Sequence, residues 1–453
     1  MASATMNGGG GGGGAAGVMK RTGLLRLQYY CVMGAVAAAV VLATLRYMPA
    51  PATTPPTVAG VDGGGAVRSA AGAGAAAAAA PGGGEARGKR VHVWSGEDEE
   101  GDEKKKKKAE PGVVVINFGD SNSDTGGVAA VMGIHIAPPE GRAYFHHPTG
   151  RLSDGRVILD FICESLNTHH LSPFMRPLGS EYSNGVNFAI AGSTATPGET
   201  TFSLDVQLDQ FVFFKERCLE SIERGEVAPI DSKGFENALY TMDIGHNDLM
   251  GVLHLPYHEI LPKLPAIVAE IKKAIKTLHK NDARKFWIHG TGALGCLPQK
   301  LATRKDDDGG LDEHGCITKI NNVAKKFNEL LSETCDDLRL EFTDSIIVFV
   351  DMFAIKYDLV ANHTKYGIKK PLMTCCGHGG PPYNYDPKIS CSVTDDKYMC
   401  KLDEKFISWD GVHFTDAANE IVASKVISGE FSIPRIKLTT TVVKPKKTKN
   451  SRL

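Results

Sequence analysis

Between residues 112 and 436, apolar runs alternate with stretches in which the apolar residues have the spacing of a helix. Four runs rich in apolar and β-branched residues are predicted strands: Val113–Phe118, Asn237–Ile244, Arg284–His289 and Ser345–Val350. Apolar residues three and four positions apart predict helices over Leu204–Cys218, Pro262–Lys280, Thr318–Leu340 and Thr415–Ile427. Strands that alternate with helices predict an α/β fold, in which a parallel sheet is covered on both faces. The active site of such a fold lies beyond the carboxyl ends of the strands.

The composition divides the chain into an unusual beginning and an ordinary globular part. The chain has 453 residues, and residues 1–111 are rich in Gly and Ala before they end in a charged run. Residues 112–436 are long enough to bury a core as one domain. The formal net charge of −1 gives no support for nucleic-acid binding, so no nucleic-acid partner is expected.

One strongly apolar run, Tyr29–Leu45, lies near the N-terminus. Its length of about 17 residues is at the lower end of what spans a membrane. Basic residues precede it, whereas only Arg46 follows closely, and this asymmetry places the N-terminus in the cytosol. We therefore predict a cytosolic Gly-rich tail over 1–28 and a signal-anchor transmembrane helix over 29–46. The alternative is a cleavable signal peptide, which would make the protein secreted.

Two further segments lack the periodicity of packed elements. Residues 47–111 are rich in Ala, Gly, Pro and charge, which predicts a disordered stem on the luminal side. Residues 437–453 are basic and Thr-rich, which predicts a flexible tail. The folded domain is then 112–436. Within it, Asn362 begins the sequon Asn-His-Thr and is a candidate glycosylation site.

The chain has ten cysteines, of which Cys31 lies in the apolar N-terminal run. They form no C-x-x-C pattern, so no metal site is predicted. Clustered cysteines in a luminal protein favour disulfides. We favour bridges among Cys376, Cys391 and Cys400, together with a bridge between Cys296 and Cys316, although the connectivity stays open. An odd luminal number leaves at least one thiol free or bonded to another molecule.

Two polar segments carry candidate nucleophilic chemistry. Phe118–Gly126 reads FGDSNSDTG and follows a predicted strand, which places Ser121 at the edge of the sheet. Near the other end, Trp409–Thr415 reads WDGVHFT, so Asp410 and His413 share one loop. A carboxylate can hold the far nitrogen of the imidazole while the near nitrogen faces a nucleophile. Each segment alone also fits an ordinary turn with a helix cap.

Two more segments could hold a negatively charged oxygen. Asn184–Ser193 ends an apolar run in Gly192, and Gly245–Asp248 follows the second predicted strand. Ester hydrolysis creates an oxyanion, and each N–H donor aimed at it is worth roughly 3 kcal/mol. The backbone N–H of Gly192 and the side-chain amide of Asn247 are the candidate donors, and turn positions are the alternative.

These four segments, in this order, resemble the blocks of the plant GDSL esterase/lipase family, within the SGNH hydrolase superfamily. The resemblance spans about 112–430 and includes the similar stretches Gly292–Pro298 and Cys375–Gly377. It implies a flavodoxin-like three-layer α/β/α sandwich with a parallel sheet of about five strands.

The resemblance also implies a serine esterase that needs no cofactor and no metal. Its triad would be Ser121, His413 and Asp410, and its oxyanion hole would use Ser121, Gly192 and Asn247. Asn122 departs from the Leu or Ile that the family usually has after the serine. That departure leaves the acyl or substrate preference open, but it does not touch the chemistry.

Other patterns point to less favoured sites. Gly290–Gly295 matches G-x-G-x-x-G after a predicted strand, but Pro298 does not suit the long helix that a dinucleotide site requires. His146-His147 and His169-His170 have no carboxylate or cysteine at ligand spacing, so they are expected in loops.

The leading functional hypothesis is an acetylesterase that deacetylates a cell-wall polysaccharide, such as acetylated xylan or its side chains. A catalytic domain on a membrane anchor and stem resembles Golgi polysaccharide O-acetyl esterases, so a single-pass type II Golgi membrane protein is expected. A lipase or small-metabolite carboxylesterase is the first alternative, and a catalytically silent glycan-binding protein is the second. A monomer is expected.

Overall fold

The computed structural model describes residues 112–305 and 308–442, which fold around one sheet. In the described residues the sheet has six strands: β1 (Val115–Gly119), β2 (Gly185–Asn187), β3 (Leu239–Asp243), β4 (Lys285–His289), β5 (Ile346–Val350) and β6 (Ser432–Ile433). Their order is β2-β1-β3-β4-β5-β6, and only β6 runs antiparallel to its neighbour. The predicted α/β sandwich is confirmed, with a short antiparallel edge strand added to five parallel strands.

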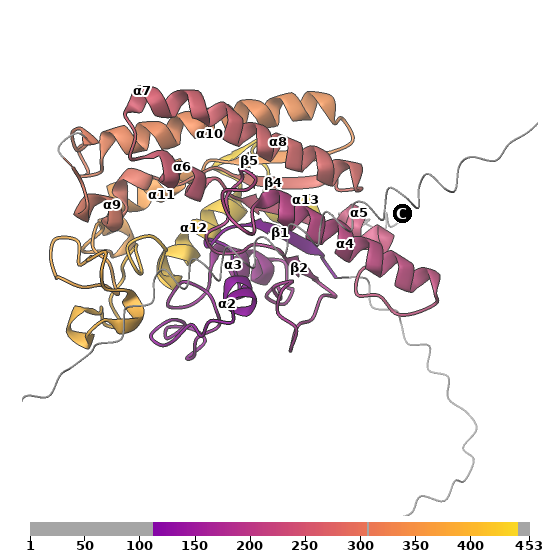
Figure 1. Cartoon of the computed structure of the whole chain (residues 1–453), viewed down its shortest axis with the longest axis horizontal. Helices are drawn as coiled ribbons and strands as arrows, with labels where there is room; N and C mark the ends of the chain where they lie inside the picture. Colours follow the sequence, from indigo (N-terminus) through magenta and orange to yellow (C-terminus); the bar gives the residue numbers. More distant parts are fainter. Residues whose placement is uncertain (1–111, 306–307, 443–453) are drawn as a thin grey trace, which may run out of the picture. The chain divides into compact units, whose positions relative to one another are not determined.

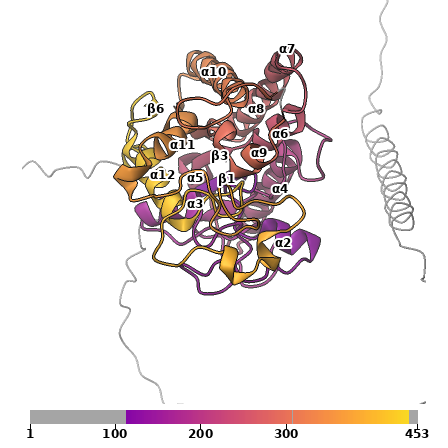
Figure 2. The same cartoon turned by 90° about the vertical axis from the view of Figure 1, so that its left-hand side faces the viewer.

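Helices cover both faces of this sheet (Figures 1 and 2). On one face α8 (Leu264–Lys280) packs against α4 (Leu204–Glu223) and α10 (Thr318–Glu341). On the other face α3 (Ile158–Ser165) packs against α12 (Asp416–Ser428), with α11 (Met352–Ala361) beside α12. The remaining α-helices of the described residues are short: α2 (Gly127–Met132), α5 (Ser232–Asn237), α6 (His246–Val252), α7 (Tyr257–Ile260), α9 (Pro298–Ala302) and α13 (Leu438–Val442).

The apolar spacing of α8 explains why it forms a covering helix. Its buried residues recur every three or four positions: Leu264, Ile267, Val268, Ile271, Ala274, Ile275 and Leu278. On its outer side Lys272 and Lys276 form ion pairs with Asp337 and Glu341 of α10.

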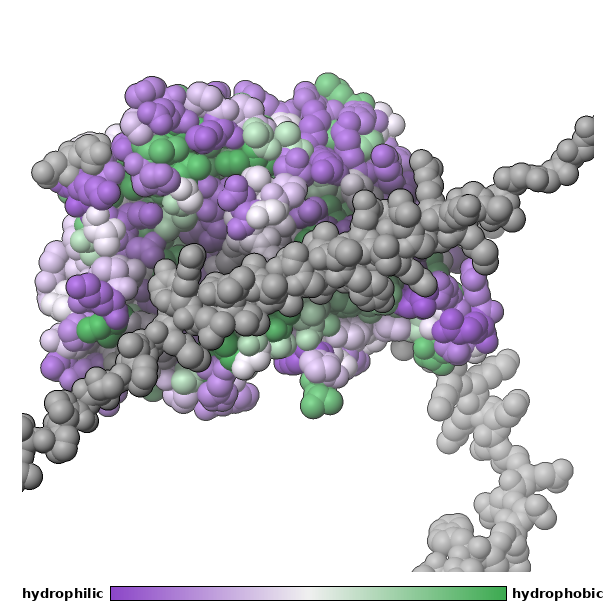
Figure 3. All heavy atoms as spheres, viewed as in Figure 1, coloured by the Kyte–Doolittle hydropathy of each residue, from purple (hydrophilic) through white to green (hydrophobic). Residues whose placement is uncertain are grey.

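Strands β1 and β3 are buried along their whole length, as expected between two helical layers. Figure 3 shows hydrophilic residues over most of the visible described surface, with smaller apolar areas between them.

The predicted elements lie where the sequence placed them, within a few residues. The predicted strand Val113–Phe118 is β1, and the predicted helix Pro262–Lys280 is α8. Strands β2 and β6 were not predicted, since they have three and two residues. Runs that short show no measurable periodicity, so only the pairing partner makes them strands.

The C-terminal tail differs from its prediction at its beginning. Helix α13 occupies residues 438–442, and Leu438 is fully buried against the domain. Residues 438–442 are therefore not a flexible tail, because one buried leucine and the contact of α13 with α12 hold them. Residues 443–453 lie outside the described residues.

Three predicted N-terminal regions precede the described part of the chain. The cytosolic tail, the signal-anchor and the stem, at 1–28, 29–46 and 47–111, lie outside the described residues. Within 112–442, apart from the gap at 306–307, the structure contains no helix long and apolar enough to cross a membrane.

Three disulfides occur in the described part of the chain: Cys296–Cys316, Cys375–Cys400 and Cys376–Cys391. The first confirms its prediction, and the third lies within the favoured set. The partner of Cys400 is Cys375, which the prediction had left out. Three buried thiols remain free there, namely Cys163, Cys218 and Cys335.

The adjacent cysteines also support the loop that carries Asp410 and His413. The N–H of Cys375 donates to the carbonyl of Ser408 (2.9 Å), and the N–H of Cys376 donates to the carbonyl of Trp409 (2.7 Å). These two hydrogen bonds therefore hold that loop against a segment that two disulfides cross-link.

The candidate glycosylation site lies at the end of α11. The Asn362 side chain is exposed and donates a 2.6 Å hydrogen bond to Asp358. Its modification stays a prediction.

Candidate active site

The ends of β1 and β3 form the edge at which the candidate site lies. The chain order reverses between these neighbouring strands, so a crevice opens beyond their carboxyl ends. Gly119 ends β1, and a Cβ there would lie 2.4 Å from the carbonyl oxygen of Asp243 at the end of β3. The glycine therefore permits a close approach, and the N–H of Asp120 donates to that carbonyl (3.2 Å). Ser121 is the second residue after Gly119, in the loop that follows β1.

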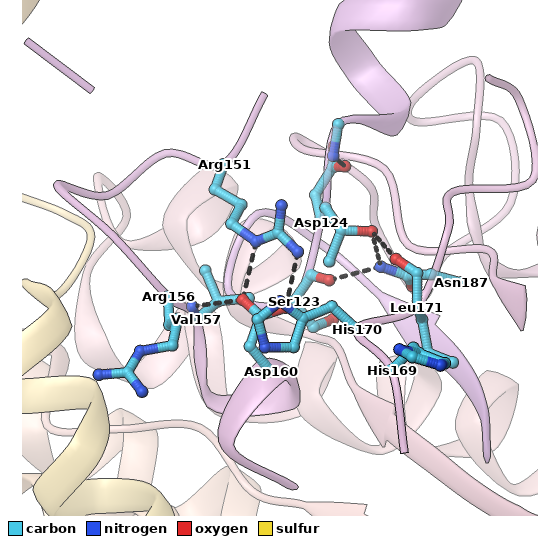
Figure 4. Close-up of polar contacts among 12 residues, drawn as sticks. Ser123, Asp124, Arg151, Arg156, Val157, Asp160, His169, His170, Leu171 and Asn187 are labelled. Atoms are coloured by element: carbon cyan, nitrogen blue, oxygen red, sulfur yellow. Dashed lines mark hydrogen bonds and ion pairs between the residues drawn. The ribbon is translucent and has the colours of Figure 1, made fainter. Parts of the chain in front are cut away.

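The loop after β1 is fixed by a buried carboxylate and a buried amide. Asp124 accepts hydrogen bonds from three backbone N–H groups around the start of α2 and from the N–H of Ala191 (2.8 Å). Asn187, at the end of β2, donates to the carbonyl of Ser123 (2.7 Å), as Figure 4 shows. These bonds hold the serine loop against the loop that contains Gly192.

A buried ion pair holds the neighbouring segment (Figure 4). Arg151 donates from Nε and Nη2 to the two carboxylate oxygens of Asp160 on α3, at 2.7 and 2.6 Å. In the same segment Ser153 Oγ donates to the carbonyl of Phe414 (3.0 Å), and Asp154 accepts from the first N–H of α12 (2.7 Å). The segment therefore braces the loop that leads into α12.

His413 and Asp410 form a hydrogen-bonded pair in that loop. His413 Nδ1 lies 2.6 Å from Asp410 Oδ2, while Asp410 Oδ1 accepts from the backbone N–H groups of Val412 (2.9 Å) and His413 (2.8 Å). Both carboxylate oxygens are thus occupied, and the carboxylate cannot rotate away. This arrangement suits a carboxylate that orients a general base.

The electrostatics of the pair favour its ionised form. Burial alone would lower the pKa of His413, but the charge of Asp410 and its hydrogen bond outweigh burial and raise that pKa. Burial alone would raise the pKa of Asp410, but His413 and the two backbone N–H groups lower it. Asp410 is therefore ionised at neutral pH, and its charge is placed where it could stabilise an imidazolium.

The loops of Ser121 and His413 converge on one small pocket. Its wall includes Asn122, the residue after Ser121, and both residues that flank His413. The charge of Asp120, the residue before Ser121, raises the pKa of His413, which also requires the loops to be close. Among the residues described, no hydrogen bond joins the Ser121 hydroxyl to another side chain, so proton transfer from Ser121 to His413 stays a prediction.

The two predicted oxyanion-hole segments also meet. Asn247, in the first turn of α6, donates from Nδ2 to the carbonyl of Ser193 (2.8 Å), and Asp248 accepts from two backbone N–H groups further along that loop. Gly192 has a φ of +86°, and no atom lies within 4 Å of where its Cβ would be. Gly192 is therefore exposed, with open space on the side where a Cβ would project.

Sequence reasoning missed a group of buried titratable side chains behind the serine loop: Asp120, Asp243, His246, His289 and Lys356. Burial and the charge of Asp243 raise the pKa of Asp120 to about 7, although hydrogen bonds from Asn122 oppose this shift. Burial and the nearby charge of Lys356 lower the pKa of His246 to about 3, so His246 is neutral. The available signal was Asp243, a carboxylate at the end of a predicted apolar strand. Lys356 offered none, because lysine is common on helix surfaces.

A second missed carboxyl group lies near the histidine loop. Glu140 is buried, and its burial together with the charge of Asp410 raises its pKa. One of its carboxyl oxygens has no hydrogen-bond partner in the described structure.

Comparison with known proteins decides the family. The sequence profile of the family described as GDSL-like Lipase/Acylhydrolase matches residues 115–426, which is more than half of the chain. The chain belongs to this family. The predicted membership of the plant GDSL group is confirmed, and the protein is a carboxylic ester hydrolase.

Several relatives of this GDSL enzyme match over nearly their whole length. The GDSL esterase/lipase At1g09390 of Arabidopsis thaliana is 50% identical over 327 residues, which cover 71% of this chain and 88% of the relative. GDSL esterase/lipase LIP-4 of the same plant is 48% identical, covering 71% and 87%. Alpha-L-fucosidase 3, also from Arabidopsis thaliana, is 38% identical, covering 70% and 90%.

The glycine pattern Gly290–Gly295 of this GDSL enzyme serves close packing. A Cβ at Gly290 would lie 2.7 Å from the side chain of Asn328, and a Cβ at Gly292 would lie 2.5 Å from that of Lys356. A 3₁₀ turn and the five-residue helix α9 follow β4, in place of the long helix that a dinucleotide site requires. The packing explains the pattern without a nucleotide.

The acid limb of the pH profile of this GDSL enzyme is expected to lie above pH 6.5. The general base must be neutral, and the pKa of His413 is raised from its ordinary 6.5, so kcat/KM should rise with pH through that higher value. Initial rates with p-nitrophenyl acetate from about pH 5 to about pH 9 measure this limb. Because the charge of Asp120 raises the pKa of His413, Asp120→Asn should move the limb to lower pH. A wild-type midpoint below pH 6.5 would contradict the prediction.

Proposed function

We propose that this protein is a serine esterase that removes acetyl groups from a cell-wall polysaccharide, such as acetylated xylan or its side chains. The observation that carries the serine mechanism is the 2.6 Å contact between His413 Nδ1 and Asp410 Oδ2, in a loop that converges with that of Ser121. The same convergence supports the choice of Ser121 as nucleophile.

The proposed reaction proceeds by acyl transfer. His413 Nε2 takes the Ser121 proton while Ser121 Oγ attacks the ester carbonyl, and Asp410 stabilises the resulting imidazolium. The backbone N–H groups of Ser121 and Gly192 and the Asn247 amide stabilise the oxyanion. The imidazolium then returns its proton to the leaving alcohol. Water hydrolyses the acyl-enzyme by the same route and regenerates the hydroxyl of Ser121.

The small pocket between the two catalytic loops supports a short acyl group. Its volume is about 30 Å³, and its wall is mainly apolar, with Leu294, Leu297 and Phe414 among the lining residues. A hollow this small would suit an acetyl group better than a long acyl chain.

A lipase is the second candidate, and a different hollow favours it. An open groove of about 410 Å³ is lined by residues of α2 and by Gly126, in the segment that follows Ser121. Apolar residues such as Ala130, Ile134 and Leu178 line it, and Leu178 is 82 % exposed. An apolar groove of this kind would suit a long acyl chain.

The proposed location is the Golgi membrane, with a single-pass type II orientation. The support is the apolar run Tyr29–Leu45 with its basic flank, followed by a Gly- and Ala-rich stem. Secretion after cleavage remains the alternative. Microscopy of the full chain with a C-terminal fluorescent tag, together with the size of the tagged product, separates the two.

Chain-length specificity tests the substrate proposal. The purified protein is assayed with p-nitrophenyl esters of increasing acyl length, and acetate release is measured from acetylated xylan. The expected result is the highest kcat/KM for the acetyl ester, together with acetate release from the polysaccharide. A rise in kcat/KM toward long acyl chains, without acetate release, would support the lipase instead. The Ser121→Ala variant is the control in every assay.

A further inference from the structure

Lys356 extends from α11 into the interior of the domain. The residue is only 8 % exposed, and lysine is almost never buried to this extent unless it is paired. Burying an ammonium group without partners is costly, so the groups around it should reveal its role. Helix α11 follows β5 and carries none of the predicted catalytic residues.

The ammonium group contacts both loops that carry the proposed triad. Lys356 Nζ lies 3.4 Å from Asn122 Oδ1, directly after Ser121. It also lies 4.6 Å from the centroid of the Phe414 ring, directly after His413. One cation thus spans the serine loop and the histidine loop.

Two acidic side chains lie close enough to act on the charge of Lys356. Burial lowers the pKa of Lys356, and the charges of Asp243 and Asp120 oppose this shift. Asn122 also donates from its side chain and backbone to Asp120 Oδ1, at 2.9 and 3.0 Å. Lys356 is therefore linked through Asn122 to Asp120, and these last two residues flank Ser121 in the sequence.

Gly292 provides the space for the lysine stem. A Cβ at this position would lie 2.5 Å from Lys356 Cδ, and no backbone atom is among its close neighbours. The φ of Gly292 is not in the left-handed region, so an alanine would be acceptable to the backbone there. The lysine stem is the group that an alanine would displace.

We propose that Lys356 is a positioning residue that clamps the Ser121 loop to the His413 loop through Asn122 and Phe414. The inference rests on the proposed triad, since it assigns Lys356 a task only if these loops must act together. It also gives a reason for Asn122: a side-chain carbonyl at that position accepts from the cation, which the usual Leu or Ile cannot do.

Kinetics of matched lysine variants test the clamp. Lys356→Met keeps the stem and removes the charge, and it should lower kcat for p-nitrophenyl acetate about 10- to 100-fold with KM within about twofold. The control is Lys215→Met. Lys215 is equally buried, but it binds Asn281 and Asp282 ahead of β4, at the opposite edge of the sheet. Its kcat should stay within about twofold of wild type.

Gly292→Ala provides a second test that needs no change in charge. In the wild-type background the added methyl group should displace the lysine stem and lower kcat. In a Lys356→Ala background the stem is absent, so the same substitution should cause no further fall. Thermal melting by circular dichroism verifies that each variant is folded. If the Lys356 variants do not fold, Gly292→Ala in the wild-type background carries the test alone: a lower kcat supports the clamp, and an unchanged kcat overturns it.

Each outcome decides between the two proposals. Full activity of folded Lys356→Met or Gly292→Ala, with an inactive Ser121→Ala, would overturn the clamp and leave the serine mechanism in place. An equal effect of Gly292→Ala in both backgrounds, or a rise in KM alone, would also overturn the clamp. Retained activity of Ser121→Ala would instead overturn the proposed function itself.

Discussion

Replacing Ser121 with alanine is expected to lower kcat for p-nitrophenyl acetate by roughly 10⁴-fold or more. The hydroxyl is the atom that forms the acyl-enzyme, and no neighbouring group replaces it: Asn122 cannot act as a nucleophile, and Ser123 is buried with its hydroxyl accepting a hydrogen bond from Asn117. Stopped-flow and steady-state assays of the purified variant, after circular dichroism has verified its fold, measure the loss.

The effects of Ser121→Ala and His413→Ala should not add. His413→Ala is expected to cost nearly as much as Ser121→Ala, and the double variant should be no slower than the slower single variant, because triad members act as a unit. Modification of the wild-type enzyme by a fluorophosphonate, located by mass spectrometry of the peptide that contains residue 121, is an independent check. Undiminished turnover of Ser121→Ala would defeat the assignment.

Replacing Asp410 with asparagine is expected to lower kcat by roughly 10⁴-fold. The side-chain oxygen of the asparagine would keep the two backbone N–H groups that now bind Oδ1 of Asp410. Its amide N–H₂ would then face His413 Nδ1, where Oδ2 now lies at 2.6 Å. The imidazole would have to accept at Nδ1 and carry its proton on Nε2, which is the wrong tautomer for a general base.

The pH profile of Asp410→Asn separates this mechanism from a loss of fold. Without the carboxylate charge, the pKa of His413 should fall, so the residual activity should have its acid limb at lower pH than the wild type. Asp282→Asn, whose carboxylate binds Lys215 at the far edge of the sheet, is the matched control and should keep wild-type activity. Activity of Asp410→Asn within about tenfold of wild type would contradict the assignment of Asp410.

The elements that the sequence predicted well are those with long, regular apolar patterns. The helices over Pro262–Lys280 and Thr318–Leu340 have many buried positions at a period near that of the α-helix, and the structure places α8 and α10 there. Strands β2 and β6 were not predicted, because two or three residues have no period. They exist because β1 and β5 offer open edges to pair with.

Disulfide pairing also depends on contacts between distant segments, which the sequence does not reveal. The clustering of cysteines indicated that bridges form, and the pair Cys296–Cys316 was predicted correctly. The partner of Cys400 is Cys375, and this pairing depends on how a loop folds back and not on the spacing of residues. Likewise, Leu438 appeared to be one apolar residue in a basic tail, but the domain offers it a buried position.

The sequence alone determined the α/β architecture, the family and the identity of the candidate catalytic residues, because local apolar periods and ordered motifs are properties of neighbouring residues. Only the tertiary structure revealed the contacts between distant segments. It brought Lys356 between Asn122 and Phe414 and placed Asp120 beside Asp243. It also showed that Gly292 leaves space for the lysine stem. Burial and electrostatic coupling depend on distances through space, and no spacing along the chain encodes them.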